Sequence, residues 1–229
     1  MATRKIKIAA SLMCDSFRHL EKSLNEMEQI GVDLVHVDVM DGLFVPNFTL
    51  GPDFIRAVKQ MTSIPVDVHL MAMMPERHLD TFLSCGVGYF SVHQEACYAL
   101  TRTVLQIKEA GVKAGVALSP STPVACLEHL LPMIDFVLLM TVEPGYAGQA
   151  LVPCAFEKIA ALRAMACRLN PSLAIEVDGN VSFEHAPRMV ATGAEILVAG
   201  TSSLFTQGMT IAEGYRKLIE ACEAGVGRR

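Results

Sequence analysis

Short apolar runs alternate with amphipathic segments along the chain. Eight runs of mainly apolar, often β-branched residues have the length and composition of strands buried on both faces, and they cover residues 6–11, 34–39, 66–71, 89–93, 113–118, 136–140, 174–178 and 195–200. The segments between them show helical periodicity. It predicts helices over residues 53–60, 76–85, 100–110, 124–131, 154–169 and 183–191.

Two further helices are predicted from single apolar faces. Near the start of the chain, an N-cap at Asp15 or Ser16 precedes a face made of Phe17, Leu20, Leu24 and Met27. Near the end, another face is made of Ile211, Tyr215, Leu218 and Cys222. Helix ends are marked by Gly31, Gly86, Gly111, Asn170 and Gly193.

Eight strand–helix units in alternation predict a parallel sheet covered by helices. Eight is the number that closes into a (β/α)8, or TIM, barrel, and 229 residues are close to the roughly 250 that such a barrel needs. An open doubly wound sheet is the competing fold, but no G-x-G-x-x-G follows the first strand. Because no linker or low-complexity tract divides the chain, we expect one α/β domain over residues 1–229.

Composition restricts the classes of partner. The net charge is −5 without a Lys/Arg cluster, so no binding of nucleic acid or anionic membrane is expected. No run approaches the roughly 18 apolar residues of a membrane span. The basic N-terminal segment has a short apolar stretch interrupted by Lys7, so a cytoplasmic protein is expected. Seven scattered cysteines without C-x-x-C spacing predict reduced thiols.

Polar side chains gather where the predicted strands end, although strands buried on both faces should be apolar there. They are Ser11, His36, Asp38, His69, His93 and Asp178. A single strand-end histidine is more often a hydrogen-bonded core residue, but these ends all meet at one mouth of a barrel. His36, Asp38, His69 and Asp178 together predict a site for Zn²⁺, Fe²⁺, Mn²⁺ or Co²⁺. For His93, a place behind the ligands and a place in the substrate lining both stay open.

Glycines mark the ends of strands six to eight. Gly145 and Gly148 lie in the loop after residue 140, Gly179 and Asn180 follow Asp178, and the last strand runs into Gly200, Thr201 and Ser202. Ordinary turns also contain glycine, but phosphate sites in these barrels commonly use the loops after strands seven and eight. Methionines stand at three strand ends, where they either fill the core or exclude water from an anionic intermediate: Met40, Met71 and Met140.

These motifs resemble the ribulose-phosphate 3-epimerase family over nearly the whole chain. The segments that carry the resemblance are VHVDVMDGLFVPNFTLGPDF (35–54), VDVHLM (66–71), MTVEPGYAGQ (140–149), EVDGN (176–180) and VAGTSSLF (198–205). Within the family, SLMC (11–14) and GTSSLF resemble the D-allulose-6-phosphate 3-epimerase branch. Asn180 stands where many members carry glycine.

The resemblance implies a role for each matching residue. The metal ligands would be His36, Asp38, His69 and Asp178, with Asp38 and Asp178 also the acid/base pair. Ser11 and His69 would contact substrate, the three methionines would line it, and its phosphate would lie at Gly145, Gly148, Gly179, Asn180, Gly200, Thr201 and Ser202. The expected activity is therefore metal-dependent 3-epimerisation of a phosphorylated ketose without an organic cofactor. Because apolar barrel surfaces often pair, a homo-oligomer is also expected.

Inversion at a carbon beside a carbonyl needs one proton removed from one face and another returned to the opposite face. Asp38 and Asp178, from strands on opposite sides of the mouth, would flank the substrate, and a metal ion would stabilise the cis-enediolate. One alternative is a sugar-phosphate decarboxylase of the same barrel type, but residues 36–41 lack the lysine of its D-x-K-x-x-D signature. The other is a barrel that binds a phosphometabolite without catalysis. The length of the ketose, pentulose or hexulose, stays open.

Overall fold

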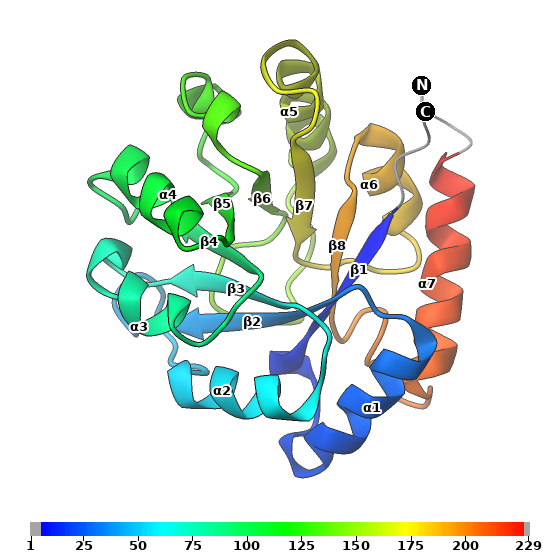
Figure 1. Ribbon diagram of the computed structural model, residues 1–229. Helices are drawn as coiled ribbons and strands as arrows, with labels where there is room; N and C mark the ends of the chain where they lie inside the picture. Colours follow the sequence, from blue (N-terminus) through cyan, green and yellow to red (C-terminus); the bar gives the residue numbers. More distant parts are fainter. Residues whose placement is uncertain (1–5, 227–229) are drawn as a thin grey trace.

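The computed structural model describes residues 6–226 and shows a closed barrel of eight parallel strands in chain order (Figure 1). Each strand pairs with its sequence neighbours, and β1 closes the ring by pairing with β8. The strands are β1 (Lys7–Ser11), β2 (Leu34–Met40), β3 (Val66–Met71), β4 (Tyr89–His93), β5 (Lys113–Leu118), β6 (Phe136–Met140), β7 (Ala174–Asp178) and β8 (Ile196–Ala199). The predicted single-domain (β/α)8 barrel is confirmed. Residues 1–5 and 227–229 of the predicted domain lie outside the described residues.

Helices surround this ring (Figure 1). Their apolar faces pack on the strands, and several end at the predicted glycines: Gly31 caps α1 in a left-handed conformation at φ +83°. The α-helices are α1 (Leu20–Ile30), α2 (Pro52–Met61), α3 (Leu79–Leu83), α4 (Leu100–Glu109), α5 (Ala155–Leu169), α6 (Ala186–Thr192) and α7 (Ile211–Val226). The 3₁₀ turns are η1 (Leu12–Cys14), η2 (Phe17–His19), η3 (Pro75–Arg77), η4 (Val124–Leu127) and η5 (Leu131–Met133).

Two predicted helices differ from the structure. The segment 124–131 forms no α-helix: η4 covers Val124–Leu127, and η5, which contains Pro132, begins only at Leu131. Its apolar residues are still buried, among them Leu127 and Leu131. The segment 76–85 is helical only in η3 and α3, and His78, at φ −112° and ψ −5°, separates the two.

The predicted start of the first helix is also wrong, because α1 begins at Leu20. Ser16 precedes η2 rather than α1, and neither it nor His19, the residue before α1, caps its helix through a side chain. The intervening 3₁₀ turn rotates Phe17 away from the predicted apolar face, so that its side chain is exposed and contacts the ring of Phe54. Leu20, Leu24 and Met27 are buried as predicted.

The main core lies between the barrel wall and the helices. All seven residues of β2 are buried, as expected for a strand covered on both sides. The seven cysteines are all free thiols, as predicted. Within residues 6–226, no helix combines the length and apolar character that a membrane crossing requires. The buried polar side chains at the strand ends are the exception in this apolar wall, and they form the site described next.

Candidate active site

Strand register brings the polar side chains together at the carboxyl ends of the strands. In the β2–β3 pair, His36 lies beside Asp67, Asp38 beside His69, and Met40 beside Met71. Since side chains alternate along a strand, these residues share the face that points into the barrel. The barrel mouth therefore has a polar floor beneath a layer of methionine.

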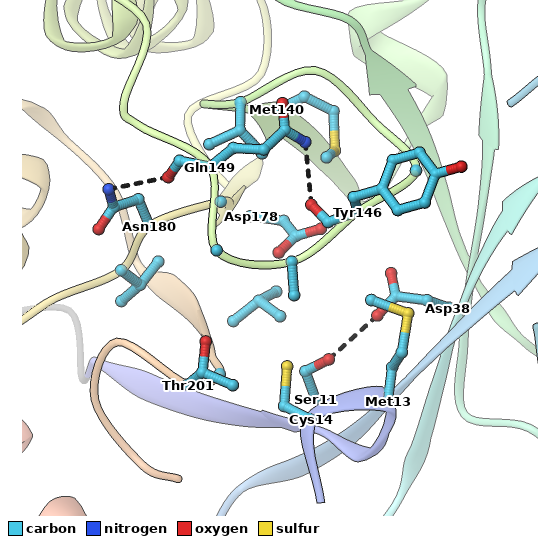
Figure 2. Close-up of a pocket in the computed structure, with 18 of the residues that line it drawn as sticks. Ser11, Met13, Cys14, Asp38, Met140, Tyr146, Gln149, Asp178, Asn180 and Thr201 are labelled. Carbon is cyan, nitrogen blue, oxygen red and sulfur yellow. Dashed lines mark hydrogen bonds between the residues drawn. The ribbon is translucent and has the colours of Figure 1, made fainter. Parts of the chain in front are cut away.

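A pocket opens above this floor (Figure 2). It is formed by the ends of β1, β2, β3, β6, β7 and β8 and the loops that follow them. Its lining includes Ser11, Asp38, Met40, Met71, Met140, Gly145, Gly148, Asp178, Gly179, Asn180, Gly200, Thr201 and Ser202. The structure thus collects every predicted substrate-binding residue except His69, which lies buried below the pocket. Met13, Cys14, Tyr146 and Gln149 also line it and were not predicted.

Among the described residues that line the pocket, none is a lysine or arginine. An anionic group would therefore depend on backbone N–H groups and on the hydroxyls of Thr201 and Ser202, as the lack of a basic cluster predicts. Only glycine fits at position 179 without a collision. Its φ is +115°, and a Cβ there would lie 2.6 Å from Val142 Cγ2 and 2.8 Å from Val142 N.

Asn180 follows in a left-handed conformation, at φ +47°. Among residues other than glycine, asparagine is one of the few that adopt this region readily. Its side-chain Nδ2 donates to the carbonyl of Gln149 at 3.0 Å, and Gln149 Nε2 donates to the carbonyl of Tyr146 (Figure 2). Gln149 Nε2 also donates to the carbonyl of Glu143. Asn180 thus performs the conformational task of a glycine and also ties the loop after β7 to the loop after β6.

The three strand-end methionines are buried at the pocket wall. Met40 and Met71 pack together with Val45, and Met140 packs in a separate cluster with Val142 and Val198. They therefore form part of the core and at the same time line the pocket, so the two interpretations of these residues do not exclude each other. Their side chains reduce access of water to the carboxylates beneath.

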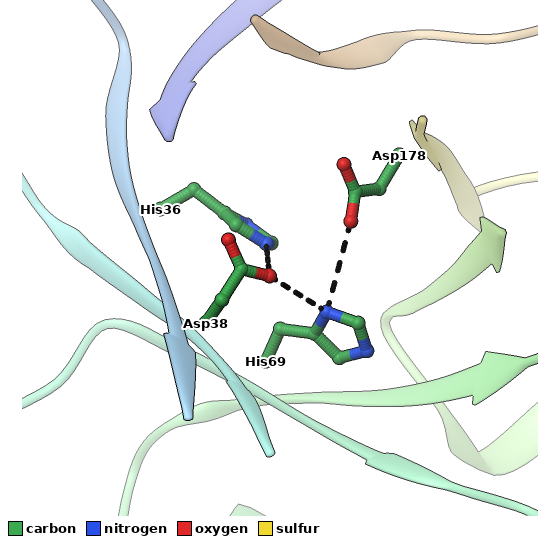
Figure 3. A group of neighbouring side chains, drawn as sticks. All are labelled: His36, Asp38, His69 and Asp178. Atoms are coloured by element: carbon green, nitrogen blue, oxygen red, sulfur yellow. Dashed lines mark hydrogen bonds and ion pairs between the residues drawn. The ribbon is translucent and has the colours of Figure 1, made fainter. Parts of the chain in front are cut away.

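Four side chains converge below the pocket (Figure 3). His36, Asp38, His69 and Asp178 each offer one ligand atom, and these atoms all lie within 4.8 Å of one another. Asp38 Oδ1 is 3.3 Å from His36 Nε2 and 3.2 Å from His69 Nδ1, while Asp178 Oδ2 is 3.8 Å from the same His69 nitrogen. The predicted ligand set is therefore assembled by the fold.

The two carboxylates differ in their surroundings. Burial opposes ionisation of Asp38, but the positive charge of the neighbouring His36 outweighs it, so the pKa of Asp38 lies far below its ordinary value. Ser11 also donates to Asp38 Oδ2 at 3.0 Å. Burial and the charge of Asp38 raise the pKa of Asp178 to about 7. Two carboxylates with separated pKa values suit proton transfer in both directions.

The imidazoles also differ. Burial opposes the charged form of His36, but Asp38 and Asp67 together raise its pKa well above the ordinary value. Burial lowers the pKa of His69 to about 4.

The donor set fits a divalent metal ion. His36 Nδ1 lies 2.5 Å from Asp67 Oδ2, so this nitrogen keeps its proton when the ring releases its other proton to bind a metal ion. Nε2 of His36 then presents a lone pair, and among the described residues it is buried without a hydrogen-bond partner. Ligand atoms about 2.1 Å from a tetrahedral metal ion lie roughly 3.4 Å apart. The separations of 3.2–3.8 Å around Asp38 and His69 match that spacing.

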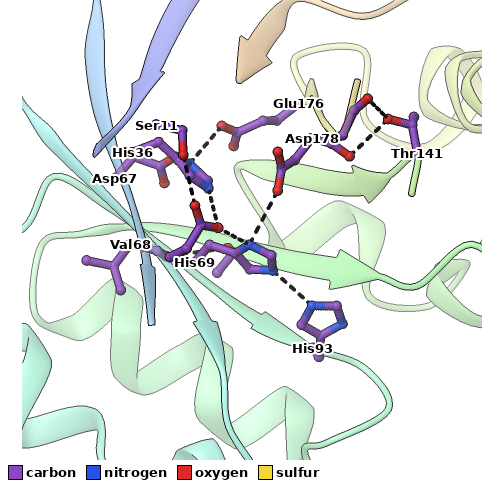
Figure 4. A network of polar contacts seen from close by, with 12 residues as sticks. Ser11, His36, Asp67, Val68, His69, His93, Thr141, Glu176 and Asp178 are labelled. Carbon is purple, nitrogen blue, oxygen red and sulfur yellow. Dashed lines mark hydrogen bonds and ion pairs between the residues drawn. The ribbon is translucent and has the colours of Figure 1, made fainter. Parts of the chain in front are cut away.

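Sequence reasoning missed three carboxylates behind these histidines, and two of them, Asp67 and Glu176, are labelled in Figure 4. Asp67 contacts His36, and the carboxyl of Glu176 is 3.6 Å from the same ring nitrogen. Burial and the charge of Asp67 raise the pKa of Glu176 well above its ordinary value. Glu95 contacts His93, which in turn contacts His69. The signal was present: Asp67, Glu176 and Glu95 each stand two residues from a predicted site residue.

Known proteins with similar sequences belong to one family of enzymes. A family model described as "Ribulose-phosphate 3 epimerase family" matches residues 7–205. The chain belongs to the ribulose-phosphate 3-epimerase family. It is 46% identical to the ribulose-phosphate 3-epimerase of Bacillus subtilis (strain 168) over 198 residues, which are 86% of this chain and 91% of that protein. It is 42% identical to the chloroplastic ribulose-5-phosphate-3-epimerase of Arabidopsis thaliana, over 86% of this chain and 71% of that protein.

Solved structures support the fold more broadly. The 3-hexulose-6-phosphate synthase from Salmonella typhimurium superposes on this epimerase-family chain with a TM-score of 0.68, covering 96% of this chain and 100% of that one. Identity in that pair is 16%, so the likeness shows the barrel alone. The predicted family, the barrel and the class of enzyme, an isomerase of the epimerase type, are confirmed.

Proposed function

We propose that this protein is a divalent-metal-dependent 3-epimerase that interconverts D-ribulose 5-phosphate and D-xylulose 5-phosphate. The observation that carries the proposal is the pair of carboxylates, Asp38 and Asp178, which line one pocket and share the His69 contact. The names of relatives that are 42–46% identical support the pentulose substrate. The allulose 6-phosphate branch expected from SLMC and GTSSLF stays a prediction.

In this proposal the ketose lies with its reacting carbons over the floor and its phosphate at the loops after β6, β7 and β8. Asp38 is ionised, accepts a hydrogen bond from Ser11, and accepts the C3 proton as a base. Asp178, whose side chain is 18% exposed against 4% for Asp38, opens further into the pocket and returns a proton to the opposite face. The roles exchange for the reverse reaction.

His36, Asp38, His69 and Asp178 would hold the metal ion. When bound, a divalent ion supplies Lewis-acid stabilisation of the negative charge that develops on the substrate oxygens. The chain itself orients the carboxylates. Thr141 Oγ1 donates to the backbone carbonyl of Asp178 at 2.9 Å, and its backbone N–H donates to the same oxygen at 2.8 Å, which fixes the end of β7. The methionines keep bulk water from the intermediate.

The decisive assay offers D-ribulose 5-phosphate and D-allulose 6-phosphate separately to purified protein and compares kcat/KM. We expect the pentulose to be preferred at least tenfold. A preference for the hexulose would move the protein to the allulose branch. Absence of turnover of both, with a metal ion bound, would support a binding barrel instead. Release of CO₂ from a sugar-acid phosphate would support the decarboxylase, which the family match disfavours.

A further inference from the structure

His93 and Glu95 form a hydrogen-bonded chain that ends at the proposed metal ligand His69. Figure 4 shows the link between the two histidines. Nε2 of His69 lies 2.9 Å from Nε2 of His93, and Nδ1 of His93 lies 3.1 Å from Oε2 of Glu95. Both imidazoles are fully buried. This hydrogen-bonded chain therefore runs from the exposed residue Glu95 to the buried floor of the pocket.

The far end of this chain is fixed by the fold. Oε1 of Glu95 accepts the backbone N–H of Ser119 at 2.8 Å and the hydroxyl of Thr122. Burial opposes its ionisation, but the hydrogen bonds from His93 and Thr122 outweigh burial and lower the pKa of Glu95 to about 2. An ionised carboxylate has no proton to donate, so the ring nitrogen that faces Oε2 must carry one.

Each hydrogen bond then determines the next. With its proton on Nδ1, a neutral His93 has only a lone pair on Nε2, so Nε2 of His69 must be the donor between the rings. A neutral His69 with its proton on Nε2 presents a lone pair at Nδ1. That nitrogen is the atom that lies 3.2 Å from Asp38 and 3.8 Å from Asp178.

We propose that Glu95, acting through His93, is a positioning residue that sets the tautomer of His69 and so keeps Nδ1 free to bind the metal ion. The inference rests on the metal-dependent function proposed above. It resolves the open role of His93, which is absent from the pocket lining and contacts the ring of His69. Asp67 performs the matching task for His36.

The substitution Glu95→Gln keeps the shape of the side chain but reverses the direction of the hydrogen bonds that link residue 95, His93 and His69. An amide has a single oxygen, and the fixed N–H of Ser119 and the hydroxyl of Thr122 compete for it. The amide NH₂ then faces His93 Nδ1 and donates to it. The proton of His93 moves to Nε2, and His69 must carry its proton on Nδ1, where the metal ion would bind.

The test uses ¹⁵N-histidine-labelled protein and Zn²⁺. Ring-nitrogen shifts report which nitrogen of His69 carries the proton, and competition with a chelator measures Zn²⁺ affinity. In Glu95→Gln we expect the His69 proton on Nδ1 before zinc is added and an affinity about ten- to a hundredfold weaker. Thr122→Val is the matched control: it removes one bond to Glu95 but leaves the contact with His93, and its affinity should stay within threefold of wild type.

Wild-type affinity together with an unchanged His69 tautomer in Glu95→Gln would overturn the inference. If that variant does not fold, a second pair decides. His93→Gln offers an acceptor oxygen to His69, whereas His93→Leu offers none, so zinc binding should be stronger in the former, and equal weakening would contradict the proposal. A wild-type protein that binds zinc through this chain but does not epimerise a ketose phosphate would overturn only the proposed function.

Discussion

Replacing Gly179 with alanine tests how tightly the fold packs the segment that follows Asp178. An L-residue at φ +115° is strained by about 1–2 kcal/mol. The new Cβ would also lie 2.6 Å from Val142 Cγ2 and 2.8 Å from the Val142 backbone nitrogen. Because a backbone atom cannot rotate away, relief requires movement of the chain, which adds about 1–3 kcal/mol. We therefore expect a loss of about 2–5 kcal/mol in the free energy of unfolding.

Urea unfolding followed by circular dichroism measures this loss. Gly31→Ala is the matched control, because Gly31 also has a positive φ, at +83°, but nothing lies within 4 Å of its added Cβ. The free energy of unfolding of this control should fall only by the backbone strain, about 1 kcal/mol. Gly179→Ala/Val142→Ala should recover part of the loss, since the side-chain collision disappears and the backbone collision stays. Equal losses at residues 179 and 31 would refute the steric argument.

Three further predictions concern the pocket and its surroundings. Asn180→Gly keeps the left-handed conformation but loses the bond to Gln149, so the KM for D-ribulose 5-phosphate should rise about fivefold in steady-state kinetics, while Asn180→Ala, which also strains the backbone, should raise it further. Treatment with a chelator should abolish epimerisation, and one equivalent of Zn²⁺, Mn²⁺ or Co²⁺ should restore it; full activity in protein verified as metal-free would contradict the ligand assignment. The pKa of Glu95 is lowered from 4.5 to about 2, so the ionised carboxylate stabilises the folded protein fully above about pH 4.5, and this contribution is lost as pH falls toward 2. After allowance for solvent screening, the contribution to the free energy of unfolding is about 1–2 kcal/mol. Urea unfolding of Glu95→Gln should lack that part of the pH dependence.

The fold was predictable because its signal is periodic. Buried parallel strands produce uninterrupted apolar runs, and the predicted run at residues 66–71 has the same bounds as β3. Helix starts and short helices were less predictable. The apolar pattern of residues 124–131 fits a helix, but the segment forms only 3₁₀ turns, and a 3₁₀ turn exposes Phe17 to solvent although its spacing from Leu20 fits a buried face.

The site was predictable where polarity conflicts with burial. His36, Asp38 and His69 were found because burying a polar or charged side chain in a strand is unfavourable unless the side chain is paired or binds a ligand. Asp67 and Glu176 obey the same rule but stand deeper in their strands, away from the mouth, and were overlooked. The chain from His69 through His93 to Glu95 depends on which ring nitrogen faces which atom, and only side-chain geometry supplies that. The expected homo-oligomer and cytoplasmic location stay predictions.

The most direct test of the two-carboxylate account is C3 proton exchange in D₂O. Wild-type protein should wash deuterium into C3 of D-ribulose 5-phosphate while it forms D-xylulose 5-phosphate. Asp178→Asn should lose epimerisation by at least about a hundredfold, the usual contribution of one acid/base group, while it still binds the metal ion. Deuterium exchange at C3 without inversion in that variant would show that Asp38 still removes and returns the proton on its own face of the substrate, and that Asp178 serves the other face. Epimerisation by Asp178→Asn at a rate near that of wild type would contradict the account.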